Sequence, residues 1–340
     1  MDFAPPHDLK DLRQCSAIIG ADRLLVQAAG GNTSIKQDGV MWIKASGTQL
    51  AQALDQEIFV AVDLTAMAND IANQPQFADE PQRYLIHKDG LRPSIETSLH
   101  AVFHQRVVLH AHCVNTIAFA VQENAIELLE TRLKEFDWAF VPYTKPGAHL
   151  ARSVQSVLRP KTNVVVLGNH GVLVTAENVA DAHNLLQRVQ NALAVNLPPH
   201  RHADNDLLKK RSGIGYDIIG PDDPIHQVAF SKHAVKQAIG GSLYPDHVTF
   251  CGIGAHALSD GETADSYCEK INERPVLIIV PDAGVLIRAG FSAASLALAR
   301  CLSDVLMRVP EQAQILYLTK EQNWELLNWA AETYRQNLNA

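Results

Sequence analysis

Two histidines in an apolar run and a third between glycines are the residues whose types and spacing best fit metal chemistry. His110 and His112 lie in VVLHAHCV (107–114), and His170 lies in GNHG (168–171). In a β-strand, residues two apart point to the same face, so the first two imidazoles project side by side. A glycine-flanked turn frees His170 from regular strand pairing. Three imidazoles with one open position form the arrangement of a catalytic zinc site.

A His-x-His pair on a strand is, by itself, more often a surface or packing pair than a pair of ligands. Here a glycine-flanked third histidine follows, and Glu96 lies just before the strand. A carboxylate beside a divalent metal is the group that proton abstraction requires. The combination favours a functional site.

The expected elements alternate between helical periodicity and short apolar runs. Helices are expected at 8–20, 94–105, 121–136, 149–158, 176–195, 224–241 and 291–309, with a last one after 319. Strands are expected at 33–46, as a hairpin turning at Asp38-Gly39, and at 58–63, 107–114, 139–143, 163–176, 246–252, 276–287 and 315–319. This pattern predicts an α/β fold.

The stretch from 197 to 213 changes abruptly to proline, charged and polar residues. Such a shift is typical of a boundary between domains. We therefore expect a metal-binding domain at 1–198, a linker at 199–213 and a C-terminal α/β domain of unknown role at 214–340.

Composition excludes several classes of function. A net charge of −8 offers no basic field for a nucleic acid. The first residues lack the pattern of a signal peptide, and no apolar run approaches the roughly 18 residues of a membrane span, so we expect a cytoplasmic protein without membrane contact. Five scattered cysteines without a C-x-x-C pair argue against disulfides or a thiolate zinc site.

Other histidines and glycines resemble known motifs only superficially. His100 and His104 have the spacing of a helical zinc motif, but Ala101 stands where that motif has glutamate. His200 and His202 lie in the expected linker with no evident third partner. The stretch 250–257 formally matches a dinucleotide fingerprint, yet no amphipathic helix follows it.

The blocks GGNTSIK, IKASGTQL, PSIETSLH, VVLHAHCV, VPYTKPG and VLGNHGVLV occur in this order within residues 8–195. In this combination the chain resembles the class II aldolase/adducin family, and the KASGT block looks most like the aldolase halves of bifunctional sugar-phosphate aldolase/dehydrogenase proteins. The resemblance implies a three-layer α/β/α domain with a mixed or antiparallel central sheet, followed here by a smaller C-terminal α/β domain. It also implies a homotetramer with active sites between subunits and a small sugar or sugar-phosphate substrate.

The resemblance assigns roles to individual residues. The family's zinc ligands fall on His110, His112 and His170, with one Zn²⁺ per subunit or another divalent metal in its place. The catalytic carboxylate falls on Glu96; in the family it approaches the metal and then leaves to take a proton from the carbon beside the carbonyl. Tyr143 aligns with a proton donor that reaches a neighbouring subunit's site.

The resemblance also assigns a set of residues to binding the substrate phosphate through their turns: Gly31, Asn32, Ser46, Gly47 and Ser94. Related aldolases have two serines before the carboxylate, whereas this chain has Ile95 at the second position. Lys44 is a candidate to compensate as a phosphate or carboxylate partner, although a lysine on a strand is more often simply solvated.

These residues predict a zinc-dependent lyase that cleaves a ketose or ketose phosphate through a metal-stabilised enediolate. Related 4-epimerases carry aspartate where this chain has Glu96, which makes epimerisation the weaker alternative. A sugar-phosphate dehydratase or decarboxylase would use the same residues and stays open. A non-catalytic, adducin-like binding module would lack the three histidines, and a dehydrogenase would rest on the 250–257 stretch alone.

Overall fold

The computed structural model describes residues 5–87, 90–329 and 338, and the chain divides into two compact units. The first unit combines residues up to 116 with residues 126–194, and the second combines residues 117–125 with residues from 195 onward. Each unit contains its own β-sheet. Within the described residues, none of the helices has the length and apolar character that crossing a membrane requires.

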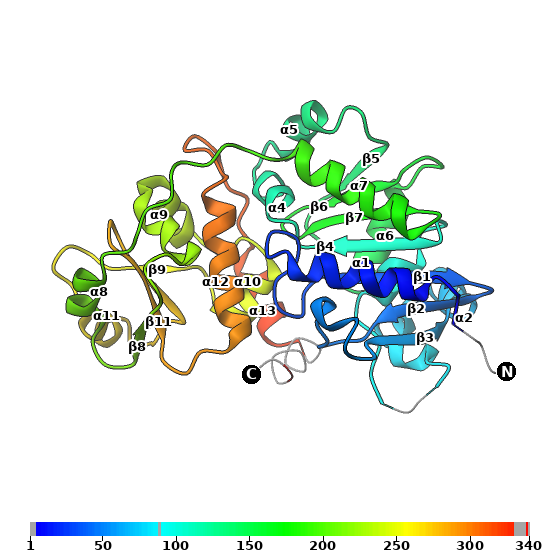
Figure 1. Ribbon diagram of the computed structural model, residues 1–340, viewed down its shortest axis with the longest axis horizontal. Coiled ribbons are helices and arrows are strands. Elements are labelled where there is room, and N and C mark those ends of the chain that lie inside the picture. Colours follow the sequence, from blue (N-terminus) through cyan, green and yellow to red (C-terminus); the bar gives the residue numbers. More distant parts are fainter. Residues whose placement is uncertain (1–4, 88–89, 330–337, 339–340) are drawn as a thin grey trace. The chain divides into compact units, whose positions relative to one another are not determined.

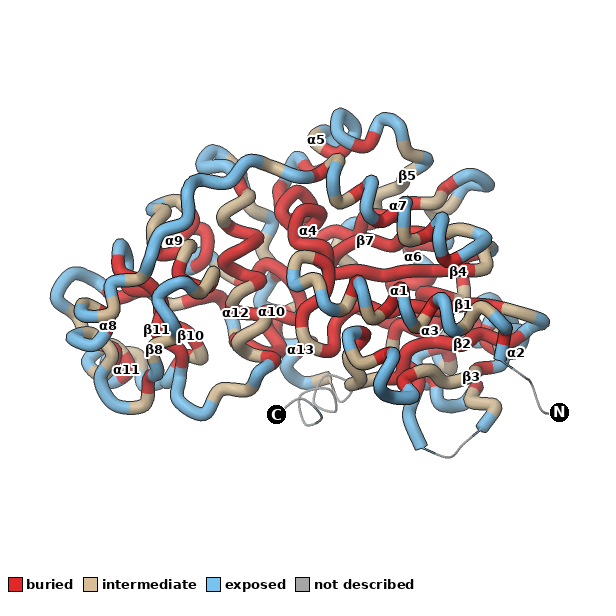
Figure 2. Tube along the Cα trace, in the orientation of Figure 1, coloured by how far each residue is buried: buried red, intermediate tan, exposed pale blue. Residues whose placement is uncertain are grey.

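The first unit is built on a seven-stranded sheet in which only β5 and β6 pair in parallel. In spatial order the strands are β3 (Phe59–Asp63), β2 (Val40–Lys44), β1 (Asn32–Gln37), β4 (Val107–Ala111), β7 (Gly171–Ala176), β6 (Val164–Leu167) and β5 (Trp138–Val141). β4 lies at the centre, and all of its residues are buried (Figure 2). The strand that carries His110 is therefore fully buried in the middle of the sheet.

Helices cover both faces of this sheet, so the unit has three layers (Figure 1). Adjacent residues of β1 show the two faces: Thr33 contacts Ser16 of α1, whereas Ser34 contacts His100 of α3. α7 packs with α1 on the first face, and α2 and α6 pack with α3 on the second. The α-helices are α1 (Leu9–Ala21), α2 (Leu64–Asn73), α3 (Thr97–Ala101), α5 (Ala125–Arg132), α6 (Ala148–Val157) and α7 (Val179–Ala192), with 3₁₀ turns at Leu50–Gln52, Pro75–Asp79 and Pro81–Tyr84. Helix α4 (Val114–Ala120) begins in this unit and ends in the second. The predicted three-layer α/β fold with a mixed sheet is confirmed.

The hairpin of β1 and β2 forms as its sequence predicts. Asp38 and Gly39 have φ of 50° and 77°, and Gln37 pairs with Val40 across the turn. A two-residue turn with positive φ at both positions matches the right-handed twist of the flanking strands. This turn fixes the register of β1 and β2.

The helix before β4 is shorter than the amphipathic pattern at 94–105 predicts, because α3 covers only Thr97–Ala101. Pro93 pairs with Ala45 in an isolated β-bridge, so the chain is still extended there. The Ser94 carbonyl then accepts hydrogen bonds from the Thr97 backbone and hydroxyl, which form a tight turn. Tertiary pairing to the 45–47 loop thus overrides the local helical pattern, and Glu96 lies at the start of α3.

The second unit has a four-stranded sheet with helices. Its strands, in spatial order, are β8 (Tyr216–Ile218), β11 (Gly284–Arg288), β10 (Leu277–Val280) and β9 (His256–Ala257). Its helices are α8 (Asn205–Ser212), α9 (Lys232–Ile239), α10 (Pro245–Cys251), α11 (Ala264–Ile271), α12 (Ala293–Leu306) and α13 (Lys320–Leu327), with a 3₁₀ helix η4 (Pro224–Phe230). α8 lies inside the stretch 199–213 that the sequence predicts as a linker, and the assignment of domains to 1–198 and 214–340 stays a prediction.

Two strand predictions in this unit are wrong. The stretch 246–252 is helix α10, which begins at Pro245 and ends before Gly252, where φ is 89°. A short apolar run does not distinguish a strand from a buried helix. The stretch 315–319 forms no sheet strand, because its N–H groups bond to separate segments, Leu316 to Val121 and Leu318 to Ser242.

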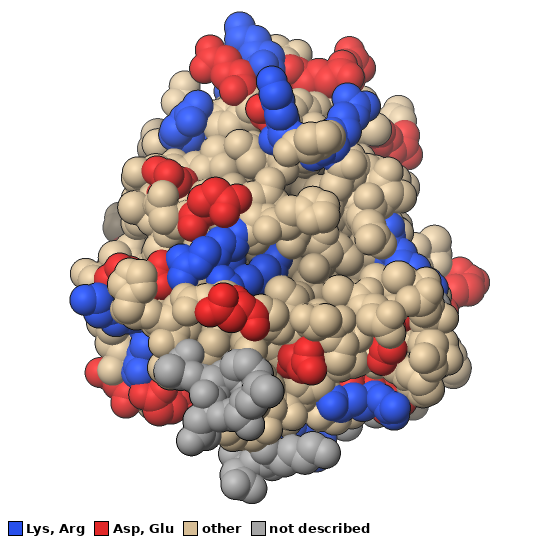
Figure 3. Space-filling model, turned by 90° about the vertical axis from the view of Figure 1, so that its right-hand side faces the viewer, with Lys and Arg blue, Asp and Glu red and all other residues tan. Residues whose placement is uncertain are grey.

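Charged side chains of both signs lie interspersed on the face drawn in Figure 3. Blue lysine and arginine groups there lie beside red aspartate and glutamate groups. That distribution agrees with the net charge of −8.

Candidate metal centre

β4 brings His110 and His112 to one side of the sheet, as its alternation predicts. Val108 belongs to the core formed with α2, α3 and α6, so His110, two residues on, points to the same face. His112 follows just beyond the end of β4, and its ring centroid lies 5.0 Å from that of His110. Both side chains are buried.

The turn between β6 and β7 supplies His170. Asn169 has a φ of 54°, and a Cβ added at Gly171 would lie only 2.3 Å from the carbonyl oxygen of Ala111. Only glycine permits this approach of the turn to the end of β4. As a result, the His170 ring centroid lies 4.9 Å from that of His110 and 5.0 Å from that of His112.

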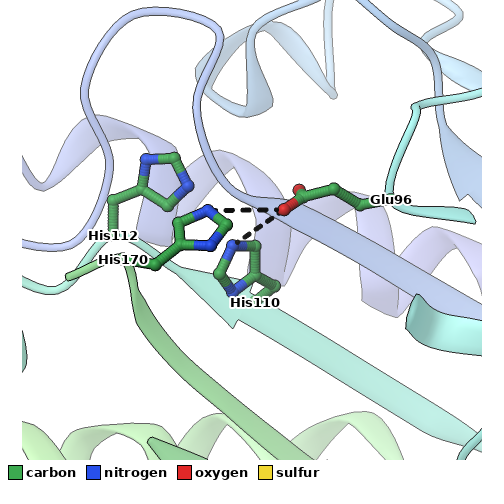
Figure 4. Close-up of side chains that lie close together, drawn as sticks. All are labelled: Glu96, His110, His112 and His170. Carbon is green, nitrogen blue, oxygen red and sulfur yellow. Dashed lines mark ion pairs between the residues drawn. The ribbon is translucent and has the colours of Figure 1, made fainter. Parts of the chain in front are cut away.

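Glu96 completes the cluster from the start of α3 (Figure 4). Its Oε1 lies 3.4 Å from Nε2 of His110 and 3.4 Å from Nε2 of His170. One potential ligand atom from each of the four residues lies within 4.8 Å of every other, and all four residues are buried. The backbone N–H of Glu96 donates to Ser94 Oγ, which holds the turn that carries the carboxylate.

The donor set fits a divalent metal ion. Ligands at about 2.0–2.1 Å from a tetrahedral metal lie about 3.4 Å apart, which matches the two Glu96–histidine distances. Nδ1 of His110 lies 3.1 Å from the carbonyl oxygen of Val172, so Nε2 is the nitrogen that faces the cluster. A backbone carbonyl on the outer ring nitrogen is the usual support of a metal-binding histidine.

Two opposing effects act on the pKa of Glu96. Burial raises the pKa of this carboxyl, whereas His110, through charge and hydrogen bonding, and the charges of His170 and His112 lower it. The imidazoles prevail, and the pKa lies well below its ordinary value. The site therefore favours an ionised carboxylate.

The predicted phosphate turns lie next to this cluster. Asn32 pairs with His110 across β1 and β4, and opposite residues share a face of the sheet. A Cβ added at Gly31, whose φ is 64°, would lie 3.0 Å from the His110 carbonyl oxygen. Ser46 donates its N–H to the carbonyl of Arg92. The turn at 31–32 thus borders the strand that carries His110, and the turn at 46–47 is bonded to the segment that leads to Glu96.

Lys44 is not in the solvated state that is usual for a lysine on a strand. Its side chain is buried, and Nζ donates to the carbonyls of Ala29, at 3.0 Å, and Thr48, at 2.8 Å. One carbonyl precedes the Gly31-Asn32 turn and the other follows the Ser46-Gly47 turn. The ammonium therefore ties the two turns together. The position of Lys44 between two glycine-containing turns is the only sequence feature that points to this role. Its partners are backbone atoms, which sequence patterns do not identify.

Tyr143 lies just beyond β5, partly buried. Gly168 donates its N–H to the carbonyl of Val141, and a Cβ at Gly168 would lie 2.9 Å from the Tyr143 nitrogen. The Tyr143 backbone is therefore next to the turn that carries His170.

His100 and His104 stay outside the cluster, as the sequence predicts. His100 is fully buried with Nδ1 2.8 Å from Ser34 Oγ, whereas His104 is exposed. The stretch 250–257 begins within helix α10 rather than after a strand, so it does not have the strand–loop–helix arrangement of a dinucleotide site.

Comparisons with known proteins cover this first unit. Residues 10–197 match the family described as Class II Aldolase and Adducin N-terminal domain. An uncharacterized oxidoreductase of Bacillus subtilis (strain 168), YuxG, is 30% identical over 188 residues, which are 51% of this chain and 27% of that protein. An L-fuculose phosphate aldolase of Methanococcus maripaludis (strain C5) is 25% identical over 170 residues, 48% of this chain and 81% of that protein.

Among solved structures, the N-terminal class II aldolase domain of a conserved protein from Thermoplasma acidophilum is similar to this chain. The TM-score is 0.50 at 21% identity, and the match covers 57% of this chain and 95% of that one. The likeness shows a shared fold. The chain spans only about a quarter, 27%, of the length of the Bacillus protein.

Replacing Lys44 with methionine is expected to lower the free energy of unfolding by about 1–3 kcal/mol, because two backbone carbonyls lose their donor. The exposed Lys10→Met is the matched control and is expected to change stability by less than about 0.5 kcal/mol. Urea unfolding measures both variants. Equal stability of the two would contradict the role of Lys44 as a tie between the turns.

The free energy of unfolding of the first unit is expected to decrease as the pH drops below 6.5, because His100 is buried in its neutral form. Burial, followed by the charge of His110, lowers the pKa of His100 from 6.5 to about 3. Below pH 6.5 the unfolded chain binds a proton at this residue while the folded chain does not. Stability is therefore lost between these values by about 1.4 kcal/mol per pH unit.

The test compares the pH slope of unfolding free energy between pH 6.5 and 5. His100→Gln is expected to show a shallower slope than the wild type, and His104→Gln, at an exposed position four residues on, the wild-type slope. An unchanged slope in His100→Gln would show that His100 does not stay neutral in the folded chain.

Proposed function

Because the chain belongs to the class II aldolase and adducin family, we propose that it is a metal-dependent aldehyde-lyase that cleaves a ketose or ketose phosphate. His110, His112 and His170 hold one Zn²⁺ per subunit, or another divalent metal in its place. Glu96 is the acid–base residue. The substrate is a small sugar or sugar phosphate.

The position of Glu96 is the observation that carries the proposal. Its Oε1 is 3.4 Å from the Nε2 atoms of two of the three proposed ligands, in a cluster that is buried. A structural carboxylate would be expected at the surface or paired with a lysine or arginine. A carboxylate among buried imidazoles instead suits proton transfer beside a metal.

When bound, the metal would act as a Lewis acid that polarises a substrate carbonyl. Aldol cleavage also needs a group that returns a proton to the carbon left after the carbon–carbon bond breaks; in the reverse direction the same group removes it. Glu96 carries this proton at Oε1. Burial of the cluster keeps bulk water from supplying the proton instead.

The turns around the cluster bind the anionic end of the substrate. Gly31, Asn32, Ser46, Gly47 and Ser94 form this set in our proposal. Asn32 Oδ1 is buried and has no hydrogen-bond partner within the described part of the chain, so it is available to a substrate hydroxyl. Backbone N–H groups in such turns suit a phosphate. Lys44 supports them indirectly by holding the carbonyls of Ala29 and Thr48.

Tyr143 is the proposed acid–base group at the aldehyde oxygen, acting in the site of a neighbouring subunit. On cleavage it takes the proton of the hydroxyl that becomes the aldehyde carbonyl, and in the condensation direction it is the proton donor to that oxygen. This role requires a homo-oligomer with shared active sites, which we propose to be a tetramer. The Tyr143 backbone borders the His170 turn, so a subunit contact at this edge would join two sites.

Dehydration, decarboxylation or 4-epimerisation of a sugar phosphate would use the same metal ligands and the same carboxylate. A non-catalytic binding module would need neither. The products of the reaction and the metal content therefore discriminate between these alternatives.

Glu96→Gln is expected to retain near-stoichiometric metal and to lower kcat for retro-aldol cleavage by about 10²- to 10⁴-fold, the usual contribution of a general acid–base residue. The double substitution His110→Ala/His112→Ala is expected to lose the metal. Metal content is measured by elemental analysis, and cleavage by aldehyde release from ketose 1-phosphates and free ketoses. His104→Ala is the control and keeps both.

Metal that is lost in the double variant, with release of dihydroxyacetone phosphate or a free aldehyde by the wild type, would support the lyase. Metal without cleavage would replace it with one of the related reactions. A wild-type protein that binds no divalent metal would leave a binding module.

A further inference from the structure

A second group of side chains of the types that bind metals lies in the second unit and shares no residue with the proposed function. One potential ligand atom each from His200, His202 and Asp222 lies within 4.8 Å of the others, and all three residues are exposed. The two imidazole centroids are 5.8 Å apart. The sequence shows only the two histidines; the third partner comes from a turn 20 residues further along the chain.

The backbone at 200–202 is held so that both histidines point the same way. Arg201, between them, donates its N–H to Gln227 Oε1 at 3.0 Å, and Gln227 Nε2 donates to the Arg201 carbonyl at 2.7 Å. The Arg201 guanidinium stacks 4.2 Å from the ring centroid of Phe230. Alternate residues of an extended segment point to opposite sides, so His200 and His202 project away from η4.

The turn that carries Asp222 is held equally firmly. Ala203 donates its N–H to the carbonyl of Pro221. The next residue, Asp223, accepts bonds at 3.0 Å from Nε of Arg300. Asp222, between these anchored neighbours, directs its carboxylate to Nδ1 of His202.

We propose that His200, His202 and Asp222 form a second metal site that takes a divalent transition-metal ion of the Zn²⁺ class. Imidazole nitrogens suit Zn²⁺, Ni²⁺ and Cu²⁺, and one carboxylate supplies the charge that a neutral histidine pair lacks. The remaining coordination positions are open to water. Ligand atoms of a tetrahedral ion lie about 3.4 Å apart, whereas the ligand atoms here lie within 4.8 Å of one another. The three side chains are exposed, so they can rotate to bring these atoms to the shorter spacing.

A plain ion pair between His202 and Asp222 is the competing explanation. It would use neither His200 nor the anchoring of Arg201 that directs both imidazoles to one side. A metal would also join the segment at 200–203 to the turn at 221–222, so loading this site should raise the melting temperature of the chain. The proposal does not depend on the chemistry proposed for the buried cluster.

The test is a Zn²⁺ titration of the full chain by calorimetry, with elemental analysis after desalting. The wild type is expected to bind two equivalents, a tight one at the buried cluster and a weaker one at the surface. His200→Ala/His202→Ala is expected to lose the weaker equivalent alone, and His110→Ala/His112→Ala the tighter one alone. Because the two double variants remove different equivalents, failure of either site is distinguishable from failure of the other.

The variant Asp222→Asn distinguishes a metal site with three protein ligands from one formed by the histidine pair alone. It is expected to weaken the second equivalent by at least about 10-fold, the smallest loss typical of removing even an outer partner of a ligand, and to abolish the metal-induced rise in melting temperature. Asp206→Asn, at another exposed aspartate of the second unit, is the matched control and leaves both unchanged. A wild type without a second equivalent, or a second equivalent that survives in His200→Ala/His202→Ala, would overturn the proposal.

Discussion

The free-energy cost of burying the charged Glu96 carboxylate is the constraint on which the arrangement of the first unit depends. Glu96 has been taken out of water into a cluster with three imidazoles, all within 4.8 Å. An isolated buried carboxylate is strongly unfavourable, and it becomes tolerable only where positive charge or donors surround it. The pKa of Glu96 lies below its ordinary value despite burial, which shows that the histidines meet this condition. A metal ion would meet it more fully, since a divalent cation outweighs the charge of one carboxylate.

The scaffold holds these four side chains from segments far apart in sequence. β4 places His110 by the alternation of strand residues, Gly171 allows the His170 turn to approach the Ala111 carbonyl, and the bridge between Ala45 and Pro93 keeps the chain extended before Glu96. The cost of burying charge also applies to the turns beside the cluster, at 31–32 and 46–47. Lys44 is buried but its ammonium is bound by the Ala29 and Thr48 carbonyls, so a second buried charge is compensated by fixing the loops beside the cluster.

Much of this arrangement could be predicted because it rests on local periodicity. The spacing of His110 and His112 and the glycines around His170 predict convergence of the imidazoles, and the turn at Asp38-Gly39 predicts the hairpin that supports them. The roles of these residues stay proposals.

Contacts between residues far apart in the sequence could not be predicted from local patterns. The bridge from Ala45 to Pro93 keeps the chain extended before α3, and the partners of Lys44 are backbone carbonyls. The third member of the surface cluster, Asp222, comes from a separate turn. Helix α10 was mistaken for a strand because a short buried apolar run has no distinguishing period.

The most direct test of the central claim, that the buried cluster is built to hold a metal ion, is anomalous diffraction at the zinc absorption edge from crystals of the Zn²⁺-loaded full chain. A peak is expected about 2.0–2.1 Å from one ring nitrogen of each of His110, His112 and His170. Density without an anomalous peak at that position, with the metal bound elsewhere or not at all, would contradict the claim.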